Sequence, residues 1–111
     1  MKVVYVAGPF RGVNHWEIAE NIRNAERLAL QVWRLGAAAI CPHANTAHFQ
    51  NAAPDEVWLA GDLAILQRCD ALIATDDWYR SVGAIAELKY ANSHHIPVFF
   101  NIESLAKWLN G

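Results

Sequence analysis

Four short apolar runs alternate along the chain with longer segments whose apolar residues recur every three or four positions. The runs cover residues 3–7, 37–41, 71–74 and 98–100. Runs of this length, bounded by Gly, Pro or polar residues, are typical of strands that are buried on both faces of a sheet. Strands that alternate with helices form βαβ units, with right-handed crossovers that place helices on both faces. The pattern therefore predicts an α/β fold with a single open parallel sheet.

The first periodic segment predicts an amphipathic helix that ends at Gly36, where glycine best tolerates a left-handed cap. Asn14 is the expected N-cap residue, and Glu17 lies three positions later as in a capping box. A second helix is expected to begin near Pro54, with a core stripe of Leu59, Leu63 and Leu66. Asp62 lies off that stripe.

Residues 43–54 are predicted to form a polar loop, and further helices are expected over residues 81–94 and 103–110. The whole chain, residues 1–111, is predicted to be one domain. We expect about four to five strands in a three-layer sandwich of the flavodoxin or Rossmann-like type, with strand order 2-1-3-4. This order reverses direction between the first and third strands, where open α/β sheets bind their ligands.

Charge and composition narrow the classes of partner. The formal net charge is −2 and there is no basic run, which argues against a polymeric nucleic acid as ligand. Hydrophobic residues make up 54% of the chain and five residues are tryptophan, so part of the apolar surface is expected in a homodimer or larger homo-oligomer. Tryptophans and the two long helices are the expected interface.

The sequence also lacks two features that would indicate a membrane or a redox role. No apolar segment is long enough for a signal-peptide core or a membrane span, so a cytoplasmic protein without membrane contact is expected. Cys41 and Cys69 form no Cys-x-x-Cys pair and are interpreted as buried reduced thiols.

Two carboxylates are the leading candidates for chemistry. Glu87 follows Ser81 by six positions, and Gly83 between them leaves room for a ligand. Asp62 lies in the segment that leads into the third strand. A pair of carboxylates is what glycosidic bond cleavage uses, one as nucleophile or base and one as acid. The alternative is that Glu87 faces solvent and pairs with Lys89 or Arg80.

The first loop and a strand tyrosine complete the candidate site. Tyr5 is placed to donate its hydroxyl to a carboxylate and keep it ionised, although a strand tyrosine is more often a core residue. The loop Gly8-Pro9-Phe10-Arg11-Gly12 matches neither a dinucleotide fingerprint nor a P-loop. Its backbone amides, arginine and aromatic ring suit a sugar or a single phosphate.

Polar residues after the second strand raise the question of a metal site. The spacing of His43, Asn45, Thr46 and His48 matches no ligand motif, and neither a metal ion nor another cofactor is expected. His43 and Asn45 are instead predicted to line the substrate site, because long loops at strand ends tend to be functional. Trp78 is placed either to stack on a base or to anchor its loop.

Three stretches together resemble a known family. They are Tyr5 with Gly8, Gly61-Asp62-Leu63 followed by residues 69–74, and Ser81-Val82-Gly83 through Glu87 to Ala91. In this order they are similar to the nucleoside 2-deoxyribosyltransferase superfamily, which includes 2′-deoxynucleoside 5′-monophosphate N-glycosidases and short uncharacterised bacterial and phage proteins.

The resemblance implies an enzyme that cleaves or transfers the N-glycosidic bond of a (deoxy)nucleoside or its 5′-monophosphate. Glu87 would attack the anomeric carbon and form a glycosyl ester, Tyr5 would orient Glu87, and Asp62 would assist proton transfer. Ser81 and the loop from Gly8 to Gly12 would hold the sugar or its 5′ group.

Two alternatives stay open from the sequence. The chain is either an enzyme or a nucleotide-binding or interaction module that keeps the fold without turnover. Another N-riboside, such as a nicotinamide nucleotide, would suit the same carboxylates. The choice between water and a second base as acceptor also stays open.

Overall fold

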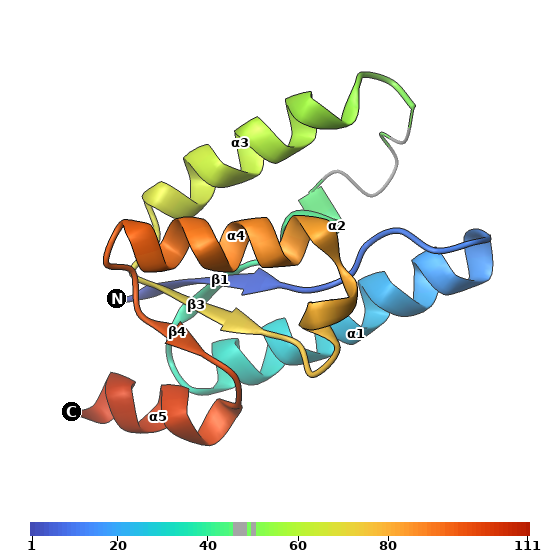
Figure 1. The fold of residues 1–111 in the computed structure, drawn as a ribbon. Helices are drawn as coiled ribbons and strands as arrows, with labels where there is room; N and C mark the ends of the chain where they lie inside the picture. Colours follow the sequence, from blue (N-terminus) through green and yellow to red (C-terminus); the bar gives the residue numbers. More distant parts are fainter. Residues whose placement is uncertain (46–48, 50) are drawn as a thin grey trace.

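A parallel sheet lies in the middle of the molecule and carries helices on both faces (Figure 1). The structure, a computed structural model, describes residues 1–45, 49 and 51–111. Its elements are, in chain order, β1 (Val3–Ala7), α1 (His15–Arg34), β2 (Ala38–Ile40), α2 (Pro42–Asn45), α3 (Asp55–Gln67), β3 (Ala71–Ala74), the 3-10 turn η1 (Trp78–Arg80), α4 (Val82–Ser93), β4 (Val98–Phe99) and α5 (Ile102–Asn110).

The strand order β2-β1-β3-β4 confirms the predicted topology. All three strand pairs are parallel, and Val4 of β1 lies opposite both Ala39 of β2 and Ala71 of β3. β1 and β3 form the centre of the sheet, and the chain reverses its winding between them. The loops that follow these two strands therefore lie side by side at the carboxyl edge of the sheet.

Alternation along β1 divides the core in two, because successive side chains of a strand point to opposite faces. Val4 and Val6 pack on the face covered by α1 and α5, together with Val32 and Leu105. Tyr5 and Ala7 point to the face covered by α3 and α4. Tyr5 is thereby directed toward the helix that carries Glu87.

The first helix forms as its sequence predicts. The side chain of Asn14 accepts a hydrogen bond from the Glu17 amide at 2.9 Å, and Glu17 reaches back to the Val13 amide at 3.3 Å. The regular helix ends at Arg34, and Gly36 has a φ of 89°, the left-handed conformation expected at this position. The side chains that α1 buries in the core are Ala25, Ala29 and Val32.

Three local predictions differ from the structure. Residues 43–45, expected in a loop, belong to the one-turn helix α2. The expected stripe of α3 is only partly buried: Leu66 is in the core, whereas Leu59 and Leu63 are half-buried. β4 ends at Phe99, and Phe100, predicted as part of that strand, is 49% exposed. α3 and β4 lie at the periphery, where fewer contacts specify an element.

Both cysteines are free thiols. Cys69 is buried, as predicted, whereas Cys41 is only partly buried. None of the helices within the described residues is long and apolar enough to cross a bilayer.

Candidate active site

Tyr5 and Glu87 meet between the sheet and α4. They are 82 positions apart in the sequence, and the Tyr5 hydroxyl donates a hydrogen bond to Oε2 of Glu87. Tyr5 is fully buried in β1, and Glu87 is 7% exposed. Glu87 is therefore not the solvent-facing residue that the alternative interpretation described.

Burial dominates the protonation of Glu87. It raises the pKa of Glu87 to about 8, while the Tyr5 hydrogen bond lowers it and the charge of Asp62 raises it further. The hydrogen bond thus acts in the predicted direction, but it does not keep the carboxyl group fully ionised at neutral pH. Burial and the neighbouring Glu87 charge raise the pKa of Tyr5, so its hydroxyl remains a donor.

Asp62 lies near this pair, on α3. It is half-buried, and burial raises its pKa to about 6. Its charge contributes to the raised pKa values of both Tyr5 and Glu87. Two carboxyl groups with raised pKa values can hold and pass a proton near neutral pH.

The first loop is fixed by two glycines that allow close approaches. A Cβ added to Gly8 would overlap the side chain of Thr75, and one added to Gly12 would overlap Glu17. The Thr75 amide also donates to Ala7 at 2.9 Å, and its hydroxyl to Asp77 at 2.8 Å. Gly8 and Thr75 therefore join the loops that follow β1 and β3. Thr75 was not predicted as a site residue, because its only distinguishing feature in the sequence is its place directly after the third strand.

The rest of this loop faces neighbouring elements. Asn21 of α1 donates to the carbonyls of Phe10 at 3.2 Å and Arg11 at 2.9 Å, which holds the loop against the helix. The Arg11 guanidinium forms an ion pair with Asp55, the first residue of α3, and both side chains are exposed. Arg11 thus connects the first loop to α3. Pro9, like Phe10, is partly buried.

The start of α4 carries two of the predicted binding residues. The Ser81 hydroxyl caps the helix by accepting from the Ala84 amide at 3.1 Å, which leaves its own proton available to a ligand. A Cβ added to Gly83 would meet only the Ser81 hydroxyl, at 3.8 Å, so Gly83 leaves space beside the cap. The cap satisfies the Ala84 amide, and the amides of Val82 and Gly83 precede it in the first turn of α4.

The remaining predicted binding residues are less closely connected to this site. The ring of Trp78 packs against Phe100 with centroids 5.6 Å apart, which matches the interpretation of Trp78 as a loop anchor. Asn45 is exposed at the end of α2. His43 belongs to the same short helix, and Thr46 and His48 lie outside the described residues. Among the side chains that are described, no group of three could hold a metal ion.

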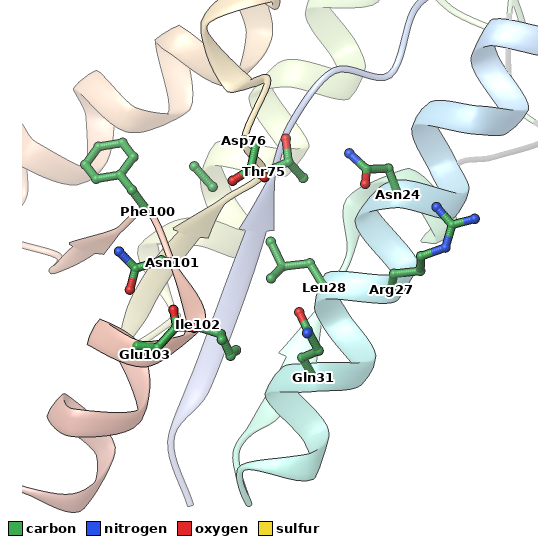
Figure 2. A pocket seen from close by; sticks show the side chains of 11 residues that line it. Asn24, Arg27, Leu28, Gln31, Thr75, Asp76, Phe100, Asn101, Ile102 and Glu103 are labelled. Atoms are coloured by element: carbon green, nitrogen blue, oxygen red, sulfur yellow. The ribbon is translucent and has the colours of Figure 1, made fainter.

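A cavity of about 260 Å³ opens on the opposite face of the sheet, between α1 and α5 (Figure 2). Its walls include Asn24 and Gln31 of α1, Thr75 and Asp76 after β3, and Asn101 before α5. Glu87, Asp62 and Tyr5 are not among the lining residues. The cavity borders the candidate site through the loop that contains Thr75 and through Phe100, against which Trp78 packs.

A match to a protein-family model identifies the family of the chain. Residues 2–101 match a family described as a domain of unknown function, DUF7768. The chain belongs to this family. A search of curated proteins finds no match.

Solved structures with the same fold include two 2-deoxyribosyltransferases. The protein from Bacillus psychrosaccharolyticus is 19% identical, with a TM-score of 0.67 over 86% of this chain and 69% of its own. The protein from Leishmania mexicana is 21% identical, with a TM-score of 0.62 over 88% and 62%. A conserved protein from Enterococcus faecalis V583 is 25% identical, with a TM-score of 0.69 over 88% and 61%.

These likenesses show that the chain has the fold of the 2-deoxyribosyltransferase structures. The chain spans about three-fifths of the length of two of the three structures.

Proposed function

We propose that this chain cleaves or exchanges the N-glycosidic bond of a (deoxy)nucleoside or nucleoside 5′-monophosphate, with Glu87 as nucleophile. The observation that supports this most is the hydrogen bond between buried Tyr5 and buried Glu87, with Asp62 acting on both. A carboxylate that is desolvated and held in one orientation is what covalent glycosidic chemistry requires.

The first chemical step breaks the bond between the anomeric carbon and the base nitrogen. One Glu87 oxygen bonds to the anomeric carbon as the base leaves with the bonding electron pair, and neutral Asp62 donates a proton to the base. The product is a glycosyl ester of Glu87 and a neutral free base. Tyr5 holds Glu87 in place through its hydrogen bond and stabilises the ionised form before attack.

The second step resolves the ester. Asp62, now ionised, takes a proton from water or from the N–H of an incoming base, whose oxygen or nitrogen attacks the anomeric carbon. The bond to Glu87 breaks, and its oxygen recovers the electron pair. Two inversions at one carbon give overall retention.

The raised pKa values of both carboxyl groups bring their proton exchange close to neutral pH. Between about pH 6 and 8 the two carboxyl groups together hold one proton. Because the pKa of Glu87 lies above that of Asp62, this proton resides mainly on Glu87 in the free protein. The reactive arrangement is the less populated one, with the proton on Asp62 and the charge on Glu87, and it forms when the proton passes from Glu87 to Asp62. Loss of the proton above this range removes the acid, and a second proton below it blocks the nucleophile, so activity is expected to fall on both sides.

The start of α4 is the proposed site for the sugar and its 5′ substituent. The free proton of Ser81, the space beside Gly83 and the amides of Val82 and Gly83 suit an oxygen-rich or anionic group. The rigid first loop with Gly8 would form the opposite wall. A soluble nucleoside or nucleotide pool is the expected source of substrate, which agrees with the cytoplasmic location predicted from the sequence.

The test is release of free base from a panel of nucleosides and nucleoside 5′-monophosphates, followed by chromatography. Wild type is expected to release base from at least one substrate, with a pH optimum between about 6 and 8. Glu87→Gln is expected to lose at least ~10³-fold in kcat, because it removes the nucleophile. Rapid acid quench and mass spectrometry should find the sugar ester on the peptide that contains Glu87.

Glu103→Gln is the matched control, because Glu103 is exposed at the start of α5. It should retain wild-type base release. No release from any member of the panel at high protein concentration would contradict the enzymatic proposal. Saturable thermal stabilisation by a nucleotide without turnover, equal in wild type and Glu87→Gln, would support a binding module instead.

A further inference from the structure

The cavity between α1 and α5 is a second place where a small molecule could bind. It has a volume of about 260 Å³ and lies on the face of the sheet opposite Glu87 (Figure 2). One of its walls is a single side of α1, because four lining residues of that helix are spaced by three, one and three positions. These residues are Asn24, Arg27, Leu28 and Gln31.

Two amide side chains of this wall have no partner in the protein. On the same helix, the Asn21 amide donates to the carbonyls of Phe10 and Arg11, so Asn21 has a structural role. Asn24 and Gln31, by contrast, form no side-chain hydrogen bond with any residue that the structure describes. Asparagine is also a poor former of helix interiors. The amides of Asn24 and Gln31 are therefore available to a ligand in the cavity.

The opposite wall is formed by the segments that follow β3 and β4. Asn101 caps α5 by accepting a hydrogen bond from the Ser104 amide at 2.8 Å, so the N–H groups of its own side chain remain as donors. Between the two walls, buried Ala74 and the half-buried side chains of Leu28 and Ile102 supply apolar surface. The cavity thus combines an apolar part with amide groups on both sides.

Charge and size narrow the class of ligand. The lining contains one guanidinium, that of Arg27, and two carboxylates, those of Asp76 and Glu103. A phosphate or carboxylate group would meet net repulsion from these charges, and Arg27 with its neighbouring amides suits a neutral molecule better than a cation. The volume lies below the roughly 300–1,000 Å³ of sites for drug-sized ligands. We therefore expect a small, uncharged ligand.

We propose that this cavity binds an uncharged heterocycle whose edge carries both hydrogen-bond donors and acceptors, which is the chemistry of a free nucleobase. The polar side chains of the lining are of the types that pair with base edges. Asn and Gln amides make two-point contacts with adenine, Arg does so with guanine, and carboxylates accept from the amino group of cytosine. The ring would contact Leu28 and Ile102, with its edges toward Asn24, Gln31 and Asn101.

Two residues connect the cavity to the candidate active site. Thr75 lines the cavity, and its side chain lies so close to Gly8 that an added Cβ would overlap it. Phe100 also lines the cavity, and its ring packs against Trp78 with centroids 5.6 Å apart. A base held in the cavity would restrict both loops and slow base release without competing with the substrate. This consequence rests on the proposed function, whereas binding of the base does not.

A titration with free bases tests the binding without any turnover. Adenine, hypoxanthine, cytosine and uracil are added to the full chain, the side-chain amide signals of Asn24 and Gln31 are followed by NMR, and the affinity is measured by calorimetry. At least one base should shift both signals saturably. Asn24→Ala and Gln31→Ala should each weaken its affinity at least about tenfold, because each removes hydrogen bonds to the ligand.

The same two variants separate a ligand site from a structural role. Neither substitution breaks a hydrogen bond within the described chain, and alanine favours the helix, so the melting temperature should be unchanged or higher. The matched controls are Asn92→Ala and Gln67→Ala, at exposed positions of α4 and α3. Both controls should bind the base with wild-type affinity.

Glu87→Gln distinguishes the cavity from the candidate active site. This variant should bind the base as tightly as wild type. Binding that is lost in Glu87→Gln but kept in Asn24→Ala would place the base at the active site and overturn the proposal. The proposal would also be wrong if no base shifted the two amide signals, or if adenosine 5′-monophosphate or 1,4-diaminobutane shifted them in place of the bases. None of these outcomes depends on whether the chain cleaves a nucleoside.

Discussion

The two faces of the central sheet are built in different ways. On one face, α1 and α5 bury apolar side chains such as Val32 and Leu105 against Val4 and Val6. On the other face, α4 buries the carboxyl group of Glu87, and α3 is anchored mainly by Leu66. The second face has its own apolar cluster, which includes Leu72 and Leu88, and it also encloses a carboxyl group whose charge depends on its surroundings.

This contrast explains where the candidate chemistry lies. A buried carboxyl group costs stability unless it is hydrogen-bonded or neutral, and Glu87 is hydrogen-bonded to Tyr5. The half-exposed helix that carries Asp62 has fewer core contacts to hold it. On this face α3 is therefore expected to be less firmly held than α4.

The largest expected effect is the difference in unfolding free energy between a substitution in α5 and one in α3. Leu105→Ala, at a fully buried position of α5, should lower the free energy of unfolding by about 2–5 kcal/mol. Leu59→Ala, at a half-buried position of α3, should cost roughly 1 kcal/mol. Urea denaturation with an unchanged m-value is the measurement. Equal losses would show that α3 belongs to the core as firmly as α5.

The next effect is the pH dependence of stability that the carboxyl groups of Glu87 and Asp62 produce. Folding raises the pKa of Glu87 from 4.5 to about 8 and that of Asp62 from 3.8 to about 6, so the folded state binds more protons than the unfolded state. The resulting stability is complete below about pH 4 and is lost as the pH rises through about 8. The melting temperature should therefore fall by at least ~5 °C between pH 5.5 and 8.5, because one pKa unit is worth about 1.4 kcal/mol.

Glu87→Gln isolates this contribution. The variant cannot ionise at position 87 and should lose most of the pH dependence, whereas Glu103→Gln should keep it. A melting temperature that is constant or rises over this range in wild type would contradict the raised pKa of Glu87.

The smallest effect compares one substitution at two glycines. Gly8→Ala should destabilise the chain by ~1–3 kcal/mol, because its Cβ overlaps Thr75 in the neighbouring loop. Gly61→Ala should stabilise the monomer by up to ~1 kcal/mol, because alanine favours the helix and meets no neighbour. Thermal unfolding at low protein concentration measures both. If both substitutions changed the stability in the same direction, the contrast between Gly8, which is packed against Thr75, and Gly61, which has no close neighbour, would be wrong.

Local sequence patterns predicted much of the fold. The central strands β1 and β3 have their predicted boundaries, because short apolar runs between polar or glycine residues have few alternatives. The caps at Asn14 and Gly36 were also predictable, since a cap depends on the residue and its immediate neighbours. Boundaries at the edges, such as those of α2 and β4, were less predictable because tertiary contacts decide them.

The sequence by itself determined the strand order, the position of Tyr5 within the first strand and the residues available for chemistry. Only the tertiary structure decided that Glu87 is buried against Tyr5, that Arg11 pairs with Asp55 and that Gly8 meets Thr75. Periodicity and capping are local properties of the chain. Desolvation, by contrast, depends on segments far apart in sequence that pack around one group, and it sets the charge of Glu87.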